Sequence, residues 1–379
     1  MKILFLIFSF NTGGIERLLI DLCNEMSKRG LDVTLCVINN DYKEYLFHEF
    51  VPEVHIIRLE RPMGSRSKLS YMARLARIIR QGHYDILHCQ GLNCVIFSIL
   101  AKLCFPHVKI LNTVHDVNNF PSYSRVQVFL HNLLCSHIIA ISTAVKQEIL
   151  ARGTKPQMVT TIYNAIDTKR FCLCSHPHMT SNQLQCLSSD MVITIGNVAR
   201  IMPEKKGQMV LLEAINILKD SYPSIRCLFA GPVALHHEDQ MEELQHYVIT
   251  HHLEDQVVFL GNVEDIPQFL SQLDVFVLPS FYEGFGIALI EALATGIPCV
   301  ASRLDGPEEI MESADMGLLF SPGNAVELSD SISAIIQNYS AYRPSLIAEH
   351  IQGKYSIENM VTYQTEIYLK CLKKDCHKK

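Results

Sequence analysis

The stretch that decides the fold runs from Pro279 to Ser302 and reads PSFYEGFGIALIEALATGIPCVAS. It follows a short apolar run, Val275 to Leu278, which is typical of a buried strand. Gly284 and Gly286 allow a tight turn, and the apolar residues Ile287 to Thr295 then predict a helix. A strand, a glycine turn and a helix in this order are typical of a parallel α/β sheet.

Two carboxylates stand in this stretch, Glu283 in the turn and Glu291 within the helix. Glu291 is the only charged residue between Phe285 and Ser302, and a buried carboxylate without a partner costs several kcal/mol by order of magnitude. Backbone amides at a helix start suit an anion, whereas carboxylates suit hydroxyl donors. We therefore expect a ligand that combines phosphate with several hydroxyls, as a sugar nucleotide does.

Apolar runs alternate with helix-length segments along most of the chain, which implies parallel sheets with helices on both faces. The pattern pauses from Thr168 to Asp190, and 379 residues exceed what one hydrophobic core usually serves. We therefore expect an α/β protein with two Rossmann-like, doubly wound parallel-sheet domains facing across a ligand cleft. The expected strands are Ile3–Phe8, Val33–Ile38, Val54–Leu59, Asp85–His88, Val108–Asn112 and Ile138–Ile141, then Val192–Gly196, Ile225–Ala230, Val257–Leu260, Val275–Leu278 and Pro298–Ala301. Helical periodicity marks Ile15–Arg29, Leu92–Leu103 and Thr143–Ala151.

The composition indicates a reducing compartment. No run approaches the ~18 to 20 apolar residues that a membrane span needs, and we interpret Met1 to Phe10 as a first strand rather than a signal peptide. Thirteen cysteines are scattered through apolar segments; Cys23, Cys36, Cys135, Cys227 and Cys299 are expected to be core residues of a cytoplasmic protein. Four residues have metal-like spacing, namely Cys172, Cys174, His176 and His178, and both an exposed linker and a zinc site stay open for them.

Charge is divided unevenly along the chain. Up to Phe171 there are 20 Lys+Arg and 13 Asp+Glu, and the remainder has 13 and 26, which together give the net charge of −6. Much of the excess lies in a basic amphipathic segment that contains Arg66, Lys68, Arg74, Arg77 and Arg80. Such a helix faces solvent, an anionic membrane surface or an anionic acceptor. No nucleic-acid partner is expected.

The carboxyl ends of parallel strands are where ligands gather in doubly wound sheets. Gly13 and Gly14 follow the first strand, and they bring backbone amides close to a ligand or form a plain tight turn. His115 and His88 lie at two further strand ends, where a histidine is either a binding or a structural residue.

A second set of cations follows the strand Val192 to Gly196. Arg200 stands in the loop after this strand, and Lys205 and Lys206 precede a helix that opens near Gly207. Two fixed cations at such a place can hold a diphosphate and offset the charge that grows on it as its bond to a sugar breaks. Either lysine satisfies the pattern.

Glu283 and Glu291 form an E-x7-E arrangement with GFG between them and EALATGIPCVAS after it. This phrase resembles family 4 of the nucleotide-sugar glycosyltransferases, which are retaining enzymes of the GT-B fold and act in surface polysaccharide synthesis. The chain departs from the family pattern at Ala199, which replaces the usual glycine before Arg200, and at Ala165, which replaces a hinge glycine.

The resemblance implies a role for each candidate residue. Glu283 and Glu291 would hold hydroxyls of the donor sugar and of the ribose, and Arg200 with Lys206 or Lys205 would hold the diphosphate. His115 would contact the transferred sugar, and Glu16 would lie on the acceptor side. His88 is expected on the acceptor side as well, because of its place at a strand end. The remaining donor-binding candidates are Gly13, Gly14, Gly261, Asn262, Gly284, Phe285 and Gly286.

The resemblance also implies a domain plan. Residues 1–168 would form the acceptor-side domain, residues 169–190 a linker and residues 191–355 the nucleotide-sugar-binding domain. A last helix over residues 356–379 would cross back onto the first domain.

The expected activity is transfer of a hexosyl or N-acetylhexosaminyl group from a nucleoside diphosphate sugar to a glycan or lipid-linked acceptor, with retention at the anomeric carbon. A UDP-sugar is the donor expected first. Peripheral contact with the inner face of an anionic membrane is expected with it. No metal or cofactor is expected, since no D-x-D pair stands at a strand end. The alternatives are a sugar-nucleotide epimerase of the same architecture and a non-catalytic binding module.

Overall fold

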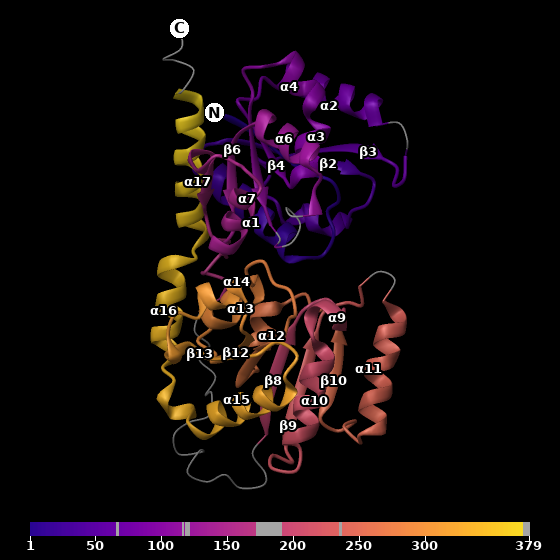
Figure 1. Cartoon of the computed structure of the whole chain (residues 1–379), viewed down its shortest axis with the longest axis vertical. Helices are drawn as coiled ribbons and strands as arrows, with labels where there is room; N and C mark the ends of the chain where they lie inside the picture. Colours follow the sequence, from indigo (N-terminus) through magenta and orange to yellow (C-terminus); the bar gives the residue numbers. More distant parts are fainter. Residues whose placement is uncertain (66–67, 116, 118–121, 172–191, 235–236, 374–379) are drawn as a thin grey trace. The chain divides into compact units, whose positions relative to one another are not determined.

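The computed structural model describes the chain except for residues 66–67, 116, 118–121, 172–191, 235–236 and 374–379 (Figure 1). It divides into two compact units: unit 1 comprises Met1–Ile166 and Ile357–Lys379, and unit 2 comprises Asp167–Ser356. The four cysteine and histidine residues with metal-like spacing, and most of the predicted linker, lie outside the described residues.

Unit 1 is built on a seven-stranded sheet in the order β3-β2-β1-β4-β5-β6-β7, and every pairing in it is parallel. The chain winds from β1 toward β3 in one direction and from β4 toward β7 in the other. The strands are β1 Lys2–Ile7, β2 Asp32–Asn39, β3 His55–Arg61, β4 Ile86–Gln90, β5 Lys109–Val114, β6 Cys135–Ala140 and β7 Val159–Thr161.

Because parallel crossovers are right-handed, this reversal places helices on opposite faces of the sheet. Helix α1 lies on one face with the C-terminal helix α17, and α2, α3, α4, α6 and α7 lie on the other (Figure 1). The helices are α1 Gly14–Lys28, α2 Lys68–Gly82, α3 Leu92–Phe97, α4 Ile99–Cys104, α6 Arg125–Leu134, α7 Thr143–Ala151 and α17 Ile357–Lys373.

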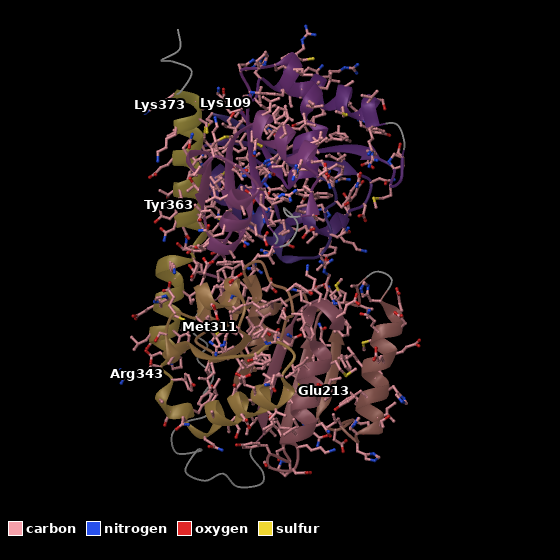
Figure 2. All side chains as sticks on the ribbon, viewed as in Figure 1. Lys109, Glu213, Met311, Arg343, Tyr363 and Lys373 are labelled. Carbon is pink, nitrogen blue, oxygen red and sulfur yellow. The ribbon has the colours of Figure 1, made fainter. Side chains whose placement is uncertain are left out.

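Helix α17 is fixed to unit 1 by a buried polar network. The hydroxyl of Tyr368 lies 2.6 Å from Nδ1 of His88 on β4, and Nε2 of His88 lies 2.7 Å from the hydroxyl of Thr113 on β5. Tyr368 OH also lies 3.1 Å from Oε1 of Gln364. Met360, Val361 and Ile367 are buried beside this network, whereas Tyr363, labelled in Figure 2, lies on the exposed face of the helix. The last described helix is therefore an integral part of unit 1.

Unit 2 repeats the plan with a six-stranded parallel sheet in the order β10-β9-β8-β11-β12-β13. Its strands are β8 Ile193–Val198, β9 Ile225–Ala230, β10 Val257–Gly261, β11 Val275–Leu278, β12 Cys299–Ser302 and β13 Gly317–Phe320. Its helices are α9 Pro203–Lys206, α10 Gln208–Leu218, α11 Glu238–Thr250, α12 Ile266–Leu270, α13 Ile287–Ala294, α14 Asp305–Ile310, α15 Ala325–Gln337 and α16 Pro344–Lys354.

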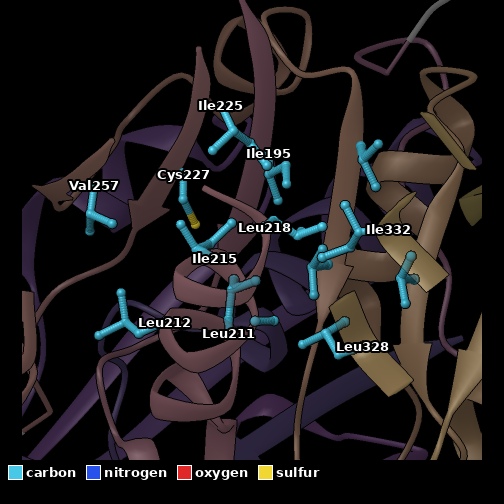
Figure 3. Close-up of a cluster of buried hydrophobic side chains, with 14 of the residues drawn as sticks. Ile195, Leu211, Leu212, Ile215, Leu218, Ile225, Cys227, Val257, Leu328 and Ile332 are labelled. Atoms are coloured by element: carbon cyan, nitrogen blue, oxygen red, sulfur yellow. The ribbon is translucent and has the colours of Figure 1, made fainter. Parts of the chain in front are cut away.

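One hydrophobic cluster of unit 2 lies between the sheet and helices α10, α11 and α15. Leu211 and Ile215 of α10 meet Ile195 and Cys227 of the sheet and Leu328 of α15, and all five are fully buried (Figure 3). Truncating one such leucine to alanine costs about 2 to 5 kcal/mol. This packing fixes the strand ends from which the site loops emerge.

All eleven expected strands are present, with end positions shifted by up to a few residues. Two short strands, β7 and β13, were not predicted. The expected helix Leu92–Leu103 is divided at Ser98, a fully buried residue whose hydroxyl donates to the carbonyl of Val95 at 2.7 Å. The five cysteines predicted to be core residues are confirmed as buried.

Candidate active site

In unit 2 the winding of the sheet reverses between β8 and β11, which are hydrogen-bonded neighbours. A reversal of this kind leaves a crevice at the carboxyl ends of the two strands, and ligands of doubly wound sheets bind there. The loop after β8 carries Arg200, the short helix α9 that follows carries Lys205 and Lys206, and the loop after β11 carries Glu283. The topology therefore brings together two groups of candidates that are about 80 residues apart in sequence.

Lys206 and Glu283 form an ion pair, with Nζ of the lysine 2.7 Å from Oε2 of the glutamate. The side chains are 22% and 16% exposed, so both charges are largely withdrawn from water. The hydroxyl of Ser280 donates to the same carboxylate oxygen at 3.4 Å. Of the two candidate lysines, the geometry favours Lys206, because it is the one whose ammonium group lies against Glu283.

Backbone contacts hold the segments that follow β8 and β11 against each other. The amide of Phe281 donates to the carbonyl of Lys205 at 2.9 Å. Gly207, which begins α10, has a φ of +67°, and a Cβ built on it would lie 1.9 Å from the carbonyl oxygen of Pro279. Glycine is thus required at this position both by the backbone conformation and by the close approach of the second loop.

Arg200 is exposed, and its guanidinium forms no hydrogen bond or ion pair with any residue that the structure describes. Its backbone is nevertheless fixed, because Nε2 of Gln208 donates to its carbonyl at 2.9 Å. The next residue, Ile201, forms a bridge with Val233 of the loop after β9. Arg200 therefore stands on a well-supported loop with its charge available to a ligand.

The glycine turn after β11 leads into α13 as predicted. Gly286 has a φ of +115° and precedes the first helical residue. Glu291, on the second turn of α13, is only 9% exposed. The side chain of Phe285 is 1% exposed and packs edge-on against Tyr355, with ring centroids 5.6 Å apart. Phe285 therefore supports the turn from within unit 2, and its backbone packs closely against Gly306 of α14.

The last pair of donor-side candidates lies at the end of β10. Gly261 has a φ of +65° and its carbonyl accepts from the amide of Gly231 at 2.7 Å. Asn262 follows and is exposed. Both residues stand at the same edge of the sheet as Arg200 and Glu283, although β10 is the outermost strand.

Unit 1 has its own reversal point, between β1 and β4. The loop after β1 carries Gly13 and Gly14, which begin the 15-residue helix α1. A Cβ on Gly13 would lie 2.6 Å from Oε2 of Glu16. The carboxylate of Glu16 therefore lies against the glycine loop, at the helix terminus that carries free backbone amides.

His115 follows β5, and its Nε2 lies 2.6 Å from Oε1 of Gln90, the last residue of β4. Burial lowers the pKa of His115 to about 4, so the ring is neutral at physiological pH. Since the amide oxygen of Gln90 only accepts, Nε2 carries the proton and Nδ1 is an acceptor. Nδ1 is buried and has no hydrogen-bond partner among the described residues. A ligand hydroxyl is a suitable donor for it.

The other candidate histidine of unit 1 is in a different position. His88 is fully buried, both ring nitrogens are engaged by Tyr368 and Thr113, and burial lowers its pKa to about 3. We therefore assign His88 to the interior of unit 1 and leave it out of the site proposed below.

Sequence reasoning missed Gln90, which orients His115. The sequence feature that could have identified Gln90 is a polar residue at the end of an apolar strand, directly before Gly91. Sequence reasoning also missed Arg61, the last residue of β3, which is considered further below.

Within the described residues, no group of three or more His, Cys, Asp or Glu side chains is arranged to hold a metal ion. Among the described helices, none has both the length and the apolar character that crossing a bilayer requires.

The chain matches two family models: Glycosyltransferase Family 4 over residues 12–170 and Glycosyl transferases group 1 over residues 185–350. Its curated relatives include N-acetyl-alpha-D-glucosaminyl L-malate synthase of Bacillus anthracis, 23% identical over 94% of this chain and 93% of the relative. A second is UDP-Gal:alpha-D-GlcNAc-diphosphoundecaprenol alpha-1,3-galactosyltransferase of Escherichia coli, 24% identical over 85% of this chain and 83% of the relative.

Among solved structures, Anabaena HepE in complex with UDP and glucose is similar over 97% of this chain and 99% of that chain, with a TM-score of 0.81 and 25% identity. The predicted GT-B architecture is thereby confirmed. Together the two family models cover both sheet units, and the chain belongs to glycosyltransferase family 4, as a glycosyltransferase with the GT-B fold.

Proposed function

We propose that this glycosyltransferase moves a hexosyl or N-acetylhexosaminyl group from a UDP-sugar to a glycan or lipid-linked acceptor, with retention at the anomeric carbon, in cell-surface polysaccharide synthesis. The observation that carries the proposal is the pairing of Lys206 with Glu283 beside the exposed Arg200, at the reversal point of the unit 2 sheet. Relatives support it, since a UDP-Gal transferase and a capsular polysaccharide glycosyltransferase, CapM of Staphylococcus aureus, are among them.

The ion pair suits a donor that carries both phosphate and hydroxyl groups. A diphosphate attracts the ammonium group of Lys206 and the guanidinium of Arg200, which neutralise the charge that grows on the leaving group. Glu283, released from the lysine, then accepts hydrogen bonds from sugar hydroxyls. Glu291 takes the ribose hydroxyls, and the loops at Gly261–Asn262 and Gly284–Gly286 approach the nucleotide through their backbones.

Unit 1 contributes a neutral acceptor and a helix terminus. The unpartnered Nδ1 of His115 accepts from a hydroxyl of the transferred sugar, and Gln90 keeps the ring in the tautomer that this requires. Gly13 and Gly14 present backbone amides at the start of α1, with Glu16 beside them on the acceptor side.

Unit 1 also supplies the proposed membrane contact, which places the enzyme in the cytoplasm at the inner membrane face. Helices α2, α3, α4 and α6 share one face of the sheet and carry no acidic residue, but they contain six basic ones. Exposed apolar side chains stand among these charges: Leu103 on α4 is 71% exposed, and Val126, Phe129 and Leu133 on α6 are 65 to 67% exposed. Basic and apolar groups on one face complement an anionic lipid surface.

Vesicle cosedimentation tests this contact. Phe129→Ser with Leu133→Ser, and separately Arg77→Glu with Arg80→Glu, should each reduce binding to vesicles of 30% anionic lipid. Tyr363→Ser with Leu369→Ser, on the exposed face of α17, is the matched control and should bind as the wild type does. Equal binding by all variants would remove the membrane contact from the proposal.

A donor screen tests the central activity. Thermal unfolding with UDP, GDP, ADP and CMP should show the largest upward shift with UDP, because a ligand that binds only the folded state stabilises it. The corresponding labelled sugar nucleotide is then incubated with lipid and glycan acceptors. Recovery of an isomerised sugar nucleotide, with no transfer, would indicate the epimerase alternative instead.

The cation clamp predicts that transfer does not require a divalent metal. Activity should persist in EDTA, since Arg200 and Lys206 supply the positive charge at the diphosphate. Loss of turnover in EDTA that magnesium restores would contradict this.

A further inference from the structure

Arg61 is the last residue of β3 and is only 8% exposed. Its Nη1 donates to Oδ1 of Asn39 at 2.8 Å and its Nη2 donates to the carbonyl of Ser65 at 2.9 Å. Both acceptors are neutral, and no carboxylate among the described residues forms an ion pair with this guanidinium. A buried charge without a counter-charge costs stability, and a role in binding an anion explains why an arginine stands at this position.

The backbone around Arg61 is distorted. Glu60 has a φ of +54°, and the pairing of β2 with β3 shifts register between Val37 and Asn39. The shift makes Asn39 and Arg61 direct partners across the two strands. Irregularities of this kind re-aim side chains at strand ends. The nearest carboxylate in sequence, that of Glu60, accepts from the hydroxyl of Tyr42 at 2.8 Å instead of pairing with Arg61.

Two hydrogen-bond donors of Arg61 and Asn39 lack a strong acceptor. Nε of Arg61 is buried and has no acceptor among the described residues. Nδ2 of Asn39 has one long contact, 3.3 Å to the hydroxyl of Ser9, and one contact with a weak acceptor, the thioether sulfur of Met63 at 3.3 Å. A thioether is a weak acceptor, and the side chain of Met63 is 64% exposed, so an oxygen ligand can replace it.

We propose that Arg61 and Asn39 form an anion-binding subsite of unit 1 that takes an oxyanion of the acceptor, either a phosphate or a carboxylate. The three side chains at this point, Ser9, Asn39 and Arg61, stand at the carboxyl ends of the neighbouring strands β1, β2 and β3 or just beyond them, at the same edge as Gly13 and His115. The assignment of the anion to an acceptor rests on the proposed function; the anion site itself does not.

The test is an NMR titration of full-length protein with ¹⁵N-labelled arginine, saturated with UDP so that the donor clamp is filled. The Nε–Hε resonance of Arg61 is identified by its loss in Arg61→Lys. Inorganic pyrophosphate and succinate are then added separately, and the one that shifts this resonance at the lower concentration identifies phosphate or carboxylate as the preferred anion. The resonance of Arg29, whose Nε already donates to Oε1 of Glu25 at 2.8 Å, is the internal control and should not move.

Arg61→Met supplies an independent measurement. If the charge is kept for binding, the variant retains or raises the thermal midpoint of the wild type, and anion-dependent stabilisation of the UDP-saturated protein is lost. The proposal is overturned if neither probe moves the Arg61 resonance in the wild type, whatever the variant does. Absence of transfer activity with an intact Arg61 response would instead count against the proposed function alone.

Discussion

Two of the charged residues in the unit 2 loops are paired, and a third, Arg200, is exposed. Lys206 and Glu283 neutralise each other, and their limited exposure makes the loss of one partner costly for the other. The sequence predicted both residues as ligand contacts. It could not predict that they pair, because a contact between residues so far apart in the chain depends on the register of β8 against β11.

Glu283→Gln tests the role of the carboxylate. The change removes the charge but keeps the shape, so kcat/KM for transfer should fall by ~10²- to 10³-fold, the size of losing one preorganised polar contact at a reacting centre. Glu204→Gln is the matched control, since Glu204 lies on neighbouring α9 with a side chain 68% exposed. Steady-state kinetics with both variants decide the point; near-normal turnover by Glu283→Gln would refute the assignment.

Gly207→Ala tests the packing of the two loops. A Cβ there meets the carbonyl of Pro279 and the backbone has a positive φ, so the variant should lose more than about 1 kcal/mol of stability and most of its affinity for UDP. Gly353→Ala in α16, whose Cβ meets nothing within 4 Å, should instead be neutral or stabilising by up to about 1 kcal/mol. Thermal unfolding and UDP titration of the pair measure both effects.

At the scale of elements, the two sheets and most strand positions could be predicted because buried parallel strands are short apolar runs bounded by polar or turn residues. The same rule missed β13, Gly317–Phe320, which begins with glycine, and β7, which has only three residues. It also missed the break between α3 and α4, because neither the burial of Ser98 nor the hydrogen bond from its hydroxyl to the carbonyl of Val95 could be predicted from the helical periodicity. Arg61 could not be identified from the sequence, because a single arginine after an apolar run is common and its burial and hydrogen-bond partners are known only from the structure.

Helix α17 offers a test at this scale. Tyr368→Phe removes the hydroxyl that bonds His88 and leaves a buried imidazole nitrogen without a partner, so stability should fall by about 1 to 3 kcal/mol. Tyr363→Phe, on the exposed face of the same helix, should change it by less than about 0.5 kcal/mol. Urea denaturation followed by circular dichroism compares them, and equal midpoints would show that the network contributes little.

For the whole molecule, buried histidines make stability depend on pH. Burial lowers the pKa of His88 to about 3 and those of His115 and His131 to about 4. In the unfolded chain each titrates near 6.5, so below that pH the unfolded state binds protons that the folded state does not. Stability is therefore full above about pH 6.5 and is lost progressively as pH falls toward 4.

The expected slope is up to about 1.4 kcal/mol per pH unit for each histidine. Urea midpoints measured between pH 7 and 5 should fall, and His131→Gln should reduce the slope by roughly a third of the histidine contribution. A flat profile in the wild type would contradict the neutral state assigned to these rings.

Unit 1 is assembled from both ends of the chain, because the segment beginning at Ile357 supplies α17. During synthesis, residues Met1–Ile166 therefore remain without α17 until all of unit 2 has been translated. At 5 to 20 residues per second this delay is roughly 10 to 40 s. The face of α1 that α17 covers stays open to chaperones throughout that interval, so the domain made first is the one completed last.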